Sequence, residues 1–586
     1  CTPELFVVMR GFIAWVSLAW CRPSLVVDTD LGPVKGRRDL VVPELRLVDK
    51  FLGIPFAEPP VGDNRFRAPQ PIKQPWGPDA RPAVRAGSPC PQFHLVGDIL
   101  YGQEDCLYLN IFAPANRSDE PLPVFLWIYG GAYMLGDGEE FGEYDGGHLV
   151  VRHNVIVVSF NYRLAGLGFF ALPELQNEDP DGSTGNYGLQ DQQAAMRWVQ
   201  KNIKNFGGDP TRVTMAGESA GGFSTMWHLV QPRSKGLFSA AISESGTSRT
   251  DWFFQPLENA TSFYSRCAED LGCKEGQDRL ECLRKVPFAR FNPSVVALAK
   301  DVITGWLHIG RGMVPGAFPF MAFSAVIDGS PAGLTDSPLA LMQKGQFNKV
   351  PLIVGANKED GDIFFPVIPV FNPKPSVDFT TFIQTAVKNT TAAQQVLEAY
   401  SLDEFGNDGR RGARFMRDVI FQCPARDVAR AFADAGGTSY LYVFSFDFGK
   451  KWMETIGDCH AMELPFLFRN YEGILGKLFN LTGYEALSDA LGCAWMSFVT
   501  CHAPQCQQPI PSCADNDAHV PAWPQYDRGN QKFNSIKASP EIGSIQELKY
   551  PQDVMSPDSR CDLLASFDLA WDDLARAQYM PNVVVV

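Results

Sequence analysis

The chain has 586 residues, and its 45% hydrophobic and 12% aromatic content is typical of a globular protein with a large core. Its 66 acidic residues outnumber its 51 basic residues and give a formal net charge of −15. This balance argues against a nucleic-acid partner, which would need a basic face.

The N-terminal residues indicate a secretory segment. Met9 and Arg10 precede the apolar run 11–20, an order typical of the charged start and short apolar core of a signal peptide. We therefore expect residues 1–23 to be a signal peptide or N-terminal extension. No later run approaches the ~20 apolar residues of a membrane helix, so no transmembrane segment is expected.

Cysteines and glycosylation sequons favour the same compartment. The chain has 14 cysteines, and none of them form a C-x-x-C pair of the kind that binds zinc. Four N-x-S/T sequons begin at Asn116, Asn259, Asn389 and Asn480. Together these features predict a protein that is secreted or held in the lumen of the secretory pathway.

The first half of the chain reads as short strands followed by a buried one. Residues 24–115 are rich in Gly and Pro, with β-like pieces at 45–48 and 107–112. The continuous apolar run 123–129 fits a buried parallel strand, and it ends in the small residues Gly130-Gly-Ala. Small residues after a strand let backbone N–H groups turn toward one point, as an oxyanion hole requires.

A strand, a helix and a second strand follow. Residues 154–163 read as another buried strand, and 190–203 as an amphipathic helix with Trp198 and Val199 on its apolar face. Gly207-Gly-Asp-Pro210 ends that helix and leads into a β-leaning run at 213–215. This order predicts a parallel βαβ arrangement and hence the α/β fold class.

The run at 213–215 leads into Gly217-Glu218-Ser219-Ala220-Gly221, after which 223–230 reads as a helix. Strand, G-x-S-x-G and helix are the context of a nucleophile elbow, which predicts Ser219 as the nucleophile. The two glycines remove side chains where strand and helix nearly touch.

The second half continues the pattern with an interruption. Residues 237–246 look like the next strand. In residues 247–345 the alternation of strands and helices stops, which predicts an insertion of helices and loops over the site. Strand-like runs return at 350–357 and 438–446. We find no internal repeat and no low-complexity segment.

A serine nucleophile needs a base, and in α/β-hydrolases the chain order is Ser, acid, His. Five of the eight histidines follow Ser219, and His228 drops out because it lies in the elbow helix. The remaining histidines are His308, His460, His502 and His519. His460 follows the strand at 438–446, which is the placement that a catalytic base needs.

Several motifs resemble the type-B carboxylesterase/cholinesterase family. They are Phe51-Leu-Gly-Ile-Pro-Phe-Ala-Glu-Pro-Pro60, Arg65-Phe-Arg-Ala-Pro69, Glu104-Asp-Cys-Leu-Tyr-Leu-Asn110 and the histidine motif 457–468. The resemblance runs from about residue 25 to the region of Cys561. It implies an α/β-hydrolase fold, with a mostly parallel sheet covered by helices on both faces, in one domain over 24–578.

The resemblance also implies three disulfides. They would join Cys90 to Cys106, Cys273 to Cys282, and Cys423 to Cys561, with Cys493 as the alternative partner of Cys423. Cys267 is left over, and Cys501, Cys506 and Cys513 have no assigned pairing.

In this family the oxyanion donors are the second and third residues of the small triplet and the residue after the nucleophile. Here these are Gly131, Ala132 and Ala220, and alanine at position 132 costs nothing if its φ stays negative. The acid is the carboxylate before the glycine in segment 355–361, which gives Asp360. Glu359 is the alternative, because the family usually carries Glu.

The resemblance implies two-step hydrolysis of small or lipid-like carboxylic esters, with no metal and no organic cofactor. A broad esterase competes with a specialised cholinesterase or lipase and with a non-catalytic adhesion module. Loop 91–105 lacks the Trp on which cholinesterases stack a quaternary ammonium, which argues against that specialisation. Glu218 is expected to join a buried polar network.

Overall fold

The computed structural model describes residues 25–566 apart from several internal segments. The segments outside the description are 94–99, 117–119, 248–252, 277, 289–322, 363–377, 388, 447–456, 472, 474–475, 478–479, 509, 515–521, 530, 537–540 and 545–557. The predicted signal peptide, residues 1–23, also lies outside the described residues.

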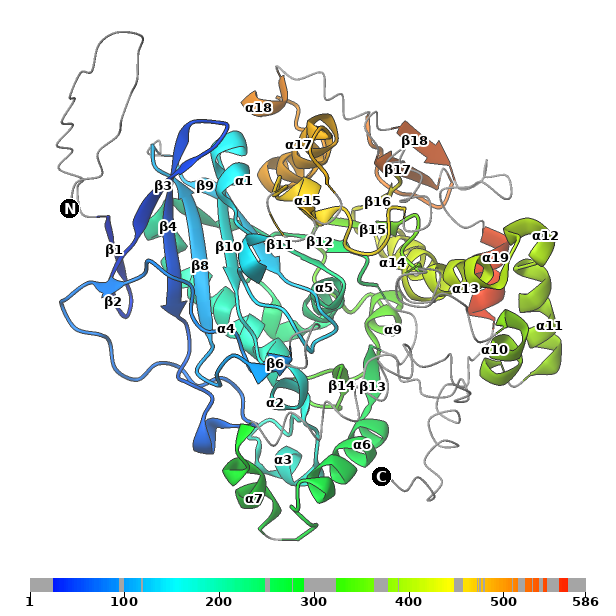
Figure 1. Cartoon of the computed structure of the whole chain (residues 1–586), viewed down its shortest axis with the longest axis horizontal. Helices are drawn as coiled ribbons and strands as arrows, with labels where there is room; N and C mark the ends of the chain where they lie inside the picture. Colours follow the sequence, from blue (N-terminus) through cyan, green and yellow to red (C-terminus); the bar gives the residue numbers. More distant parts are fainter. Residues whose placement is uncertain are drawn as a thin grey trace.

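A large mixed sheet runs through the molecule (Figure 1). Strand β9 (Leu122–Ile128) lies between β10 (Ile156–Phe160) and β11 (Gly208–Glu218), and both pair with it in parallel. The parallel part continues from β11 through β12 (Ala240–Glu244), β15 (Leu352–Asn357), β16 (Ser439–Phe444) and β17 (Lys532–Ile536). Antiparallel strands extend both ends: β8 (Tyr108–Pro114), β4 (Arg46–Pro55) and β3 (Arg37–Val41) beyond β10, and β18 (Glu541–Ser544) beyond β17.

Burial explains why the central strands have no polar alternation. Every residue of β9, β10, β12 and β15 is buried, as expected for parallel strands covered on both faces. The predicted strands at 123–129 and 154–163 are therefore confirmed, within a few residues at their ends.

Helices cover both faces of this sheet (Figure 1). One group packs together on one face: α4 (Tyr187–Asn202), α5 (Ala220–Val230), α9 (Pro338–Gln343) and α14 (Cys423–Asp434). The other face carries α1 (Gly147–His153), α15 (Leu464–Leu467) and α17 (Glu485–Cys501). The α/β class and the layered arrangement expected from the sequence are confirmed.

Smaller elements surround this core. The predicted insertion at 247–345 contains β13 (Phe254–Pro256), α6 (Leu257–Asp270), α7 (Arg279–Lys285), β14 (Ala325–Ile327) and α9, although its segment 289–322 lies outside the description. The other peripheral helices are α2 (Ala165–Phe169), α3 (Pro173–Glu178), α10 (Phe379–Ala386), α11 (Thr390–Ala399), α12 (Leu402–Phe405), α13 (Asp408–Arg417), α18 (Pro511–Ala514) and α19 (Asp558–Ala565), with a π-helical turn at Asp418–Gln422. The minor strands are β1 (Val26–Thr29), β2 (Gly32–Lys35), β5 (Arg81–Pro82), β6 (Gln92–Phe93) and β7 (Leu100–Tyr101).

The three expected disulfides are present: Cys90–Cys106, Cys273–Cys282 and Cys423–Cys561. The alternative partner of Cys423 is ruled out, because Cys493 of α17 bonds to Cys513 of α18 instead. A further disulfide, Cys501–Cys506, joins two cysteines that lie between Cys493 and Cys513 in the sequence. Cys267 and Cys459 are buried free thiols.

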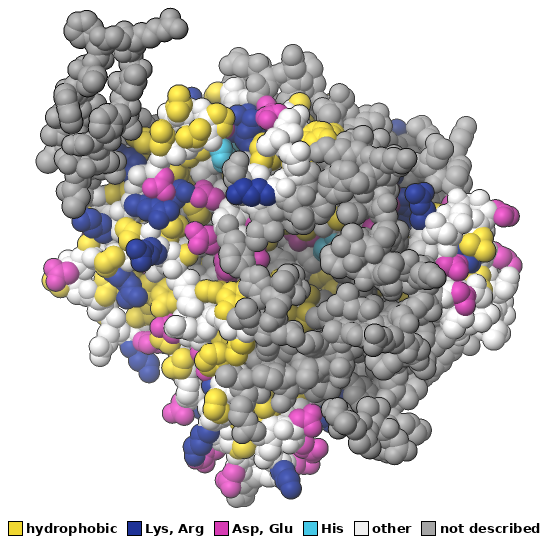
Figure 2. Space-filling model, viewed as in Figure 1, with side chains coloured by type: hydrophobic (Ala, Val, Ile, Leu, Met, Phe, Trp, Pro, Cys, Tyr) yellow, Lys and Arg dark blue, Asp and Glu magenta, His cyan; other side chains and the backbone are white. Residues whose placement is uncertain are grey.

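Charged side chains of both signs lie interspersed over the β1–β4 side of the face in Figure 2, where no continuous basic field is visible. Among the described residues, no helix is both long enough and apolar enough to cross a bilayer.

A buried ion pair ties helix α4 to the chain leaving β10. Arg163 donates to both carboxylate oxygens of Asp191, at 2.7 and 2.6 Å, and the backbone N–H of Arg163 donates to Asp191 at 3.0 Å. Both side chains are buried. Because both charges are removed from water, the stability of each charged side chain in the core depends on the opposite charge of its partner.

We expect Asp191→Asn to lower the free energy of unfolding by roughly 3–5 kcal/mol, because it leaves the Arg163 charge buried without a counter-ion. The matched control is Asp181→Asn, whose ion pair with Arg233 is 38% and 40% exposed, and which should cost less than about 1 kcal/mol. Denaturant unfolding of both variants with the disulfides intact measures the difference. Equal, small losses would contradict the expectation.

Candidate active site

Ser219 lies at the sharp turn between β11, which ends at Glu218, and α5, which begins at Ala220. Its backbone has φ 54° and ψ −121°, a strained conformation for a residue with a side chain. The N–H of Ser219 donates to the carbonyl of Glu244 on β12 at 2.9 Å, which holds the turn. Ser219 remains partly exposed while Glu218 and Ala220 are buried.

The two glycines of the elbow are required by a close approach of three backbones. A Cβ on Gly221 would lie 1.9 Å from the carbonyl oxygen of Ile128, and one on Gly217 would lie 2.6 Å from the carbonyl carbon of Gly221. No side chain fits at either position, so strand β9, strand β11 and helix α5 meet only because both residues are glycine.

His460 lies on the loop beyond β16. Its Nδ1 is 2.8 Å from Oδ1 of Asp360, and its ring packs against Phe421 with 4.8 Å between ring centroids. Its Nε2 lies 3.1 Å from Oε1 of Glu218, the residue before Ser219. The imidazole therefore spans from the acid on the β15 loop to the elbow.

Asp360 is fixed through its second oxygen. Oδ2 accepts a hydrogen bond from the Ser245 hydroxyl at 2.8 Å and from the backbone N–H of Asn357 at 2.7 Å, and the residue is fully buried. The side chain of Asn357 also donates to the carbonyl of Cys459 at 2.8 Å, which links the acid loop to the histidine loop.

The alternative acid, Glu359, points elsewhere. Its carboxylate accepts from the Arg414 guanidinium, and the Lys358 ammonium lies 3.7 Å away. Of the two neighbouring carboxylates, Asp360 is the one that contacts His460.

Gly131 and Ala132, two of the residues expected to donate to an oxyanion, lie on the loop after β9, and the third, Ala220, begins α5. Among the described residues, the N–H groups of Gly131, Ala132 and Ala220 donate to no protein acceptor. The N–H groups of Met134 and Leu135 both donate to the carbonyl of Gly131, at 2.9 and 3.1 Å, and close a tight turn.

The condition under which Ala132 would cost nothing, a negative φ, is not met in this loop. Ala132 has φ +57° and Tyr133 has φ +56°. The turn closed on Gly131 places both of its central residues in the left-handed region, as in type I′ turns. An alanine in this region costs roughly 1–2 kcal/mol.

Three further carboxyl groups are buried near His460 and Asp360: Glu218, Glu244 and Glu463. Trp495 Nε1 donates to Glu244 at 2.8 Å, and Asn357 Nδ2 donates to Glu463. Burial raises the pKa of Glu244 to about 8. Burial also raises the pKa of Glu218 and of Glu463 well above the ordinary value, and the charges of Asp360 and Glu244 raise both further. Glu218 thus belongs to a buried polar network, as expected.

Sequence reasoning missed Ser245, Asn357, Glu244 and Glu463. The sequence did carry a signal for each of them. Glu244 and Ser245 lie near the end of the strand predicted at 237–246, and Asn357 is the last residue of the strand predicted at 350–357. Glu463 follows His460 by three residues. In the described part of the chain, the cluster with metal-ligand spacing is His153, Cys493 and Cys513, but its sulfurs are joined in a disulfide.

Comparison with known proteins adds sequence and structural relatives. The carboxylesterase family matches residues 23–554. Para-nitrobenzyl esterase of Bacillus subtilis (strain 168) is 35% identical, over 81% of this chain and 89% of the relative. Cholinesterase of Mus musculus is 32% identical (94% and 90%), and acetylcholinesterase of Danio rerio is 30% identical (91% and 88%). A solved PNB esterase superposes with a TM-score of 0.73 at 29% identity, over 92% of this chain and 99% of that one.

We expect Ala132→Gly to raise the free energy of unfolding by about 0.5–1 kcal/mol, because glycine occupies a positive φ without the Cβ penalty. The matched control is Ala220→Gly, which should destabilise by about 1 kcal/mol because Ala220 lies in helix α5. Thermal unfolding followed by circular dichroism measures both changes. If both variants lose stability alike, Ala132 carries no such strain.

Proposed function

The chain belongs to the carboxylesterase family and is a serine hydrolase of carboxylic esters, and we propose that Ser219, His460 and Asp360 carry out the reaction. The observation that supports this assignment most directly is the 2.8 Å contact between His460 and Asp360, with the imidazole reaching the residue next to Ser219. Asp360 holds His460 in the tautomer that carries the proton on Nδ1, which leaves Nε2 to accept the serine proton.

The proposed reaction has two steps. Nε2 of His460 takes the proton of Ser219 as its hydroxyl oxygen attacks the ester carbonyl, and the imidazolium then protonates the leaving alcohol. Water attacks the acyl-enzyme in the same way and releases the acid. The N–H groups of Gly131, Ala132 and Ala220 are the proposed donors to the oxyanion, since none is used within the described protein.

The buried carboxyl groups fit this assignment. Glu218 lies 3.1 Å from His460 Nε2. Burial and the nearby charges of Asp360 and Glu244 raise the pKa of Glu218 well above its ordinary value, which favours the neutral form of this carboxyl beside the imidazole.

We favour a broad carboxylic-ester hydrolase over a cholinesterase-like enzyme. The relatives include both kinds, but loop 91–105 of this chain contains no Trp to stack on a quaternary ammonium. A lipase-like preference for long acyl chains is the second candidate. A non-catalytic module is disfavoured, because nucleophile, base and acid residues are all present.

We also propose a secretory location and one domain over 24–578. Five disulfides support the location, because such bonds persist in oxidising compartments. The sequon residues Asn389 and Asn480 are exposed, as glycosylation requires. The sheet that draws strands from Arg37 to Ser544 supports the single domain.

A fluorophosphonate probe tests the nucleophile. We expect one covalent adduct, located on Ser219 by peptide mass spectrometry, together with loss of hydrolysis of short-chain p-nitrophenyl esters. Ser219→Ala should take no label and lose a factor on the order of 10⁵ or more in kcat. A folded protein without adduct and without turnover would overturn the assignment.

The acid is tested by paired amide substitutions. Asp360→Asn should lower kcat by about 10⁴, because an amide at this position favours the wrong histidine tautomer. Glu359→Gln is the matched control and should keep kcat within about tenfold of the parent, since Glu359 pairs with Arg414. Both variants are first checked for folding by circular dichroism. The reverse ranking would identify Glu359 as the acid.

A further inference from the structure

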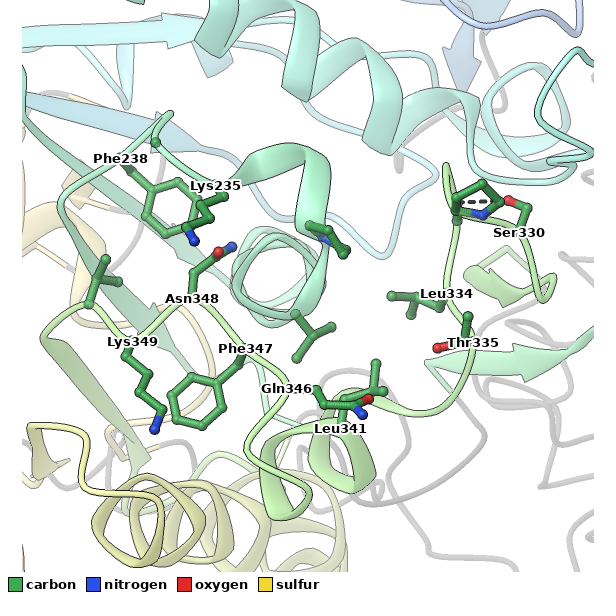
Figure 3. A pocket seen from close by; sticks show the side chains of 16 residues that line it. Lys235, Phe238, Ser330, Leu334, Thr335, Leu341, Gln346, Phe347, Asn348 and Lys349 are labelled. Carbon is green, nitrogen blue, oxygen red and sulfur yellow. Dashed lines mark hydrogen bonds between the residues drawn. The ribbon is translucent and has the colours of Figure 1, made fainter.

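Figure 3 shows the lining of a pocket of about 890 Å³. The pocket lies at the C-terminal end of helix α5, whereas Ser219 precedes the N-terminal end of that helix. Its wall includes Val230, the last residue of α5, so the eleven residues of this helix, about 16 Å, separate the pocket from the elbow. The segments before β12 and β15 supply most of the other lining residues. The pocket is therefore distinct from the site that contains His460 and Asp360.

The floor of the pocket is apolar. Val230, Phe238, Leu334 and Leu341 line it and are each no more than 5% exposed, and the half-buried ring of Phe347 adds to this surface. A pocket of several hundred Å³ with such walls suits the apolar body of a small molecule.

The charged lining residues are all of one sign. Among the described residues that line the pocket, the charged side chains are Lys235 and Lys349, both exposed, and none is acidic. Figure 3 shows Lys235 beside Phe238 and Asn348, and Lys349 beside Phe347. In a chain with a net charge of −15, this local excess of cations gives an anion a preferred position.

Neighbouring cations outside the pocket are neutralised, whereas these are not. Arg233 pairs with Asp181 at 2.6 Å, and Lys344 pairs with Asp336 at 2.6 Å. Within the described residues, Lys235 has no ion pair. Lys349 Nζ donates to the carbonyl of Ala435 at 2.8 Å, and two of its three N–H donors remain for a ligand.

From this geometry we propose that the pocket binds a single-chain amphiphilic anion, of which a fatty acid is the simplest. The carboxylate contacts Lys235 and Lys349 at the rim, and the alkyl chain lies over Phe238, Leu334 and Leu341. The esterase assignment is not needed for this proposal, because the pocket shares no residue with the proposed triad.

Sodium dodecanoate, held below its critical micelle concentration, is the probe, and isothermal titration calorimetry on the full chain is the measurement. We expect saturable binding that weakens about tenfold or more in the double variant Lys235→Ala/Lys349→Ala and also weakens with added salt. Gln346→Trp, at an exposed lining position, should block the pocket without removing either charge.

Three controls make the test specific. Lys344→Ala removes a nearby lysine that is already ion-paired, and it should leave the dissociation constant unchanged. Lys235→Arg/Lys349→Arg should retain binding because the charge is kept. Dodecanol, which has the chain without the charge, should bind at least tenfold more weakly than dodecanoate.

Specific results would overturn the proposal. The first is that dodecanoate does not bind the parent protein. The second is that it binds the parent, the double variant and Gln346→Trp equally well. The third is that dodecanol binds the parent as tightly as dodecanoate does. Equal binding to all variants would place dodecanoate elsewhere, for instance where an ester substrate binds. A loss with Lys344→Ala as large as that of the double variant would indicate unspecific electrostatic attraction.

Discussion

The close approach of strand β9, strand β11 and helix α5 is the constraint on which the site depends. The carbonyl of Ile128 lies where a side chain of Gly221 would be, and the chain turns from strand to helix at Ser219 with a positive φ. That conformation is stable because the hydrogen bond from Ser219 N–H to the Glu244 carbonyl ties the turn to the neighbouring strand. The nucleophile is therefore presented by backbone packing, and its own side chain stays free for chemistry.

The same edge of the parallel sheet brings the other groups together. The acid follows β15 and the histidine follows β16, and these strands are hydrogen-bonded neighbours. Asn357 connects the two loops, since its backbone N–H holds Asp360 and its side chain holds the carbonyl of Cys459. Neighbouring strands whose following loops are linked in this way fix the imidazole better than its own rotamer preferences would.

Burial of several carboxyl groups in one place raises their pKa values, because exclusion of water disfavours the charged form. It does so for Glu218, Glu244 and Glu463, and the charges of Asp360 and Glu244 raise the pKa of Glu218 and of Glu463 further. Asp360, by contrast, accepts hydrogen bonds on both of its oxygens, from Ser245, Asn357 and His460. The site thus combines one hydrogen-bonded carboxyl partner of His460 with a set of buried neighbours whose pKa values are raised.

The sequence by itself determined the central parallel strands up to 438–446, the elbow at Ser219 and the place of His460 after a strand, because apolar runs, glycine spacing and chain order are local or ordered signals. It left the choice between Asp360 and Glu359 open, and it did not fix the backbone of Ala132. Only the tertiary structure shows that Asp360 contacts His460 while Arg414, more than fifty positions away, pairs with Glu359, and that closure of the turn on Gly131 gives Ala132 a positive φ. The carboxyl cluster and the Cys493–Cys513 bridge likewise depend on residues distant in sequence, and local patterns carry no record of such contacts.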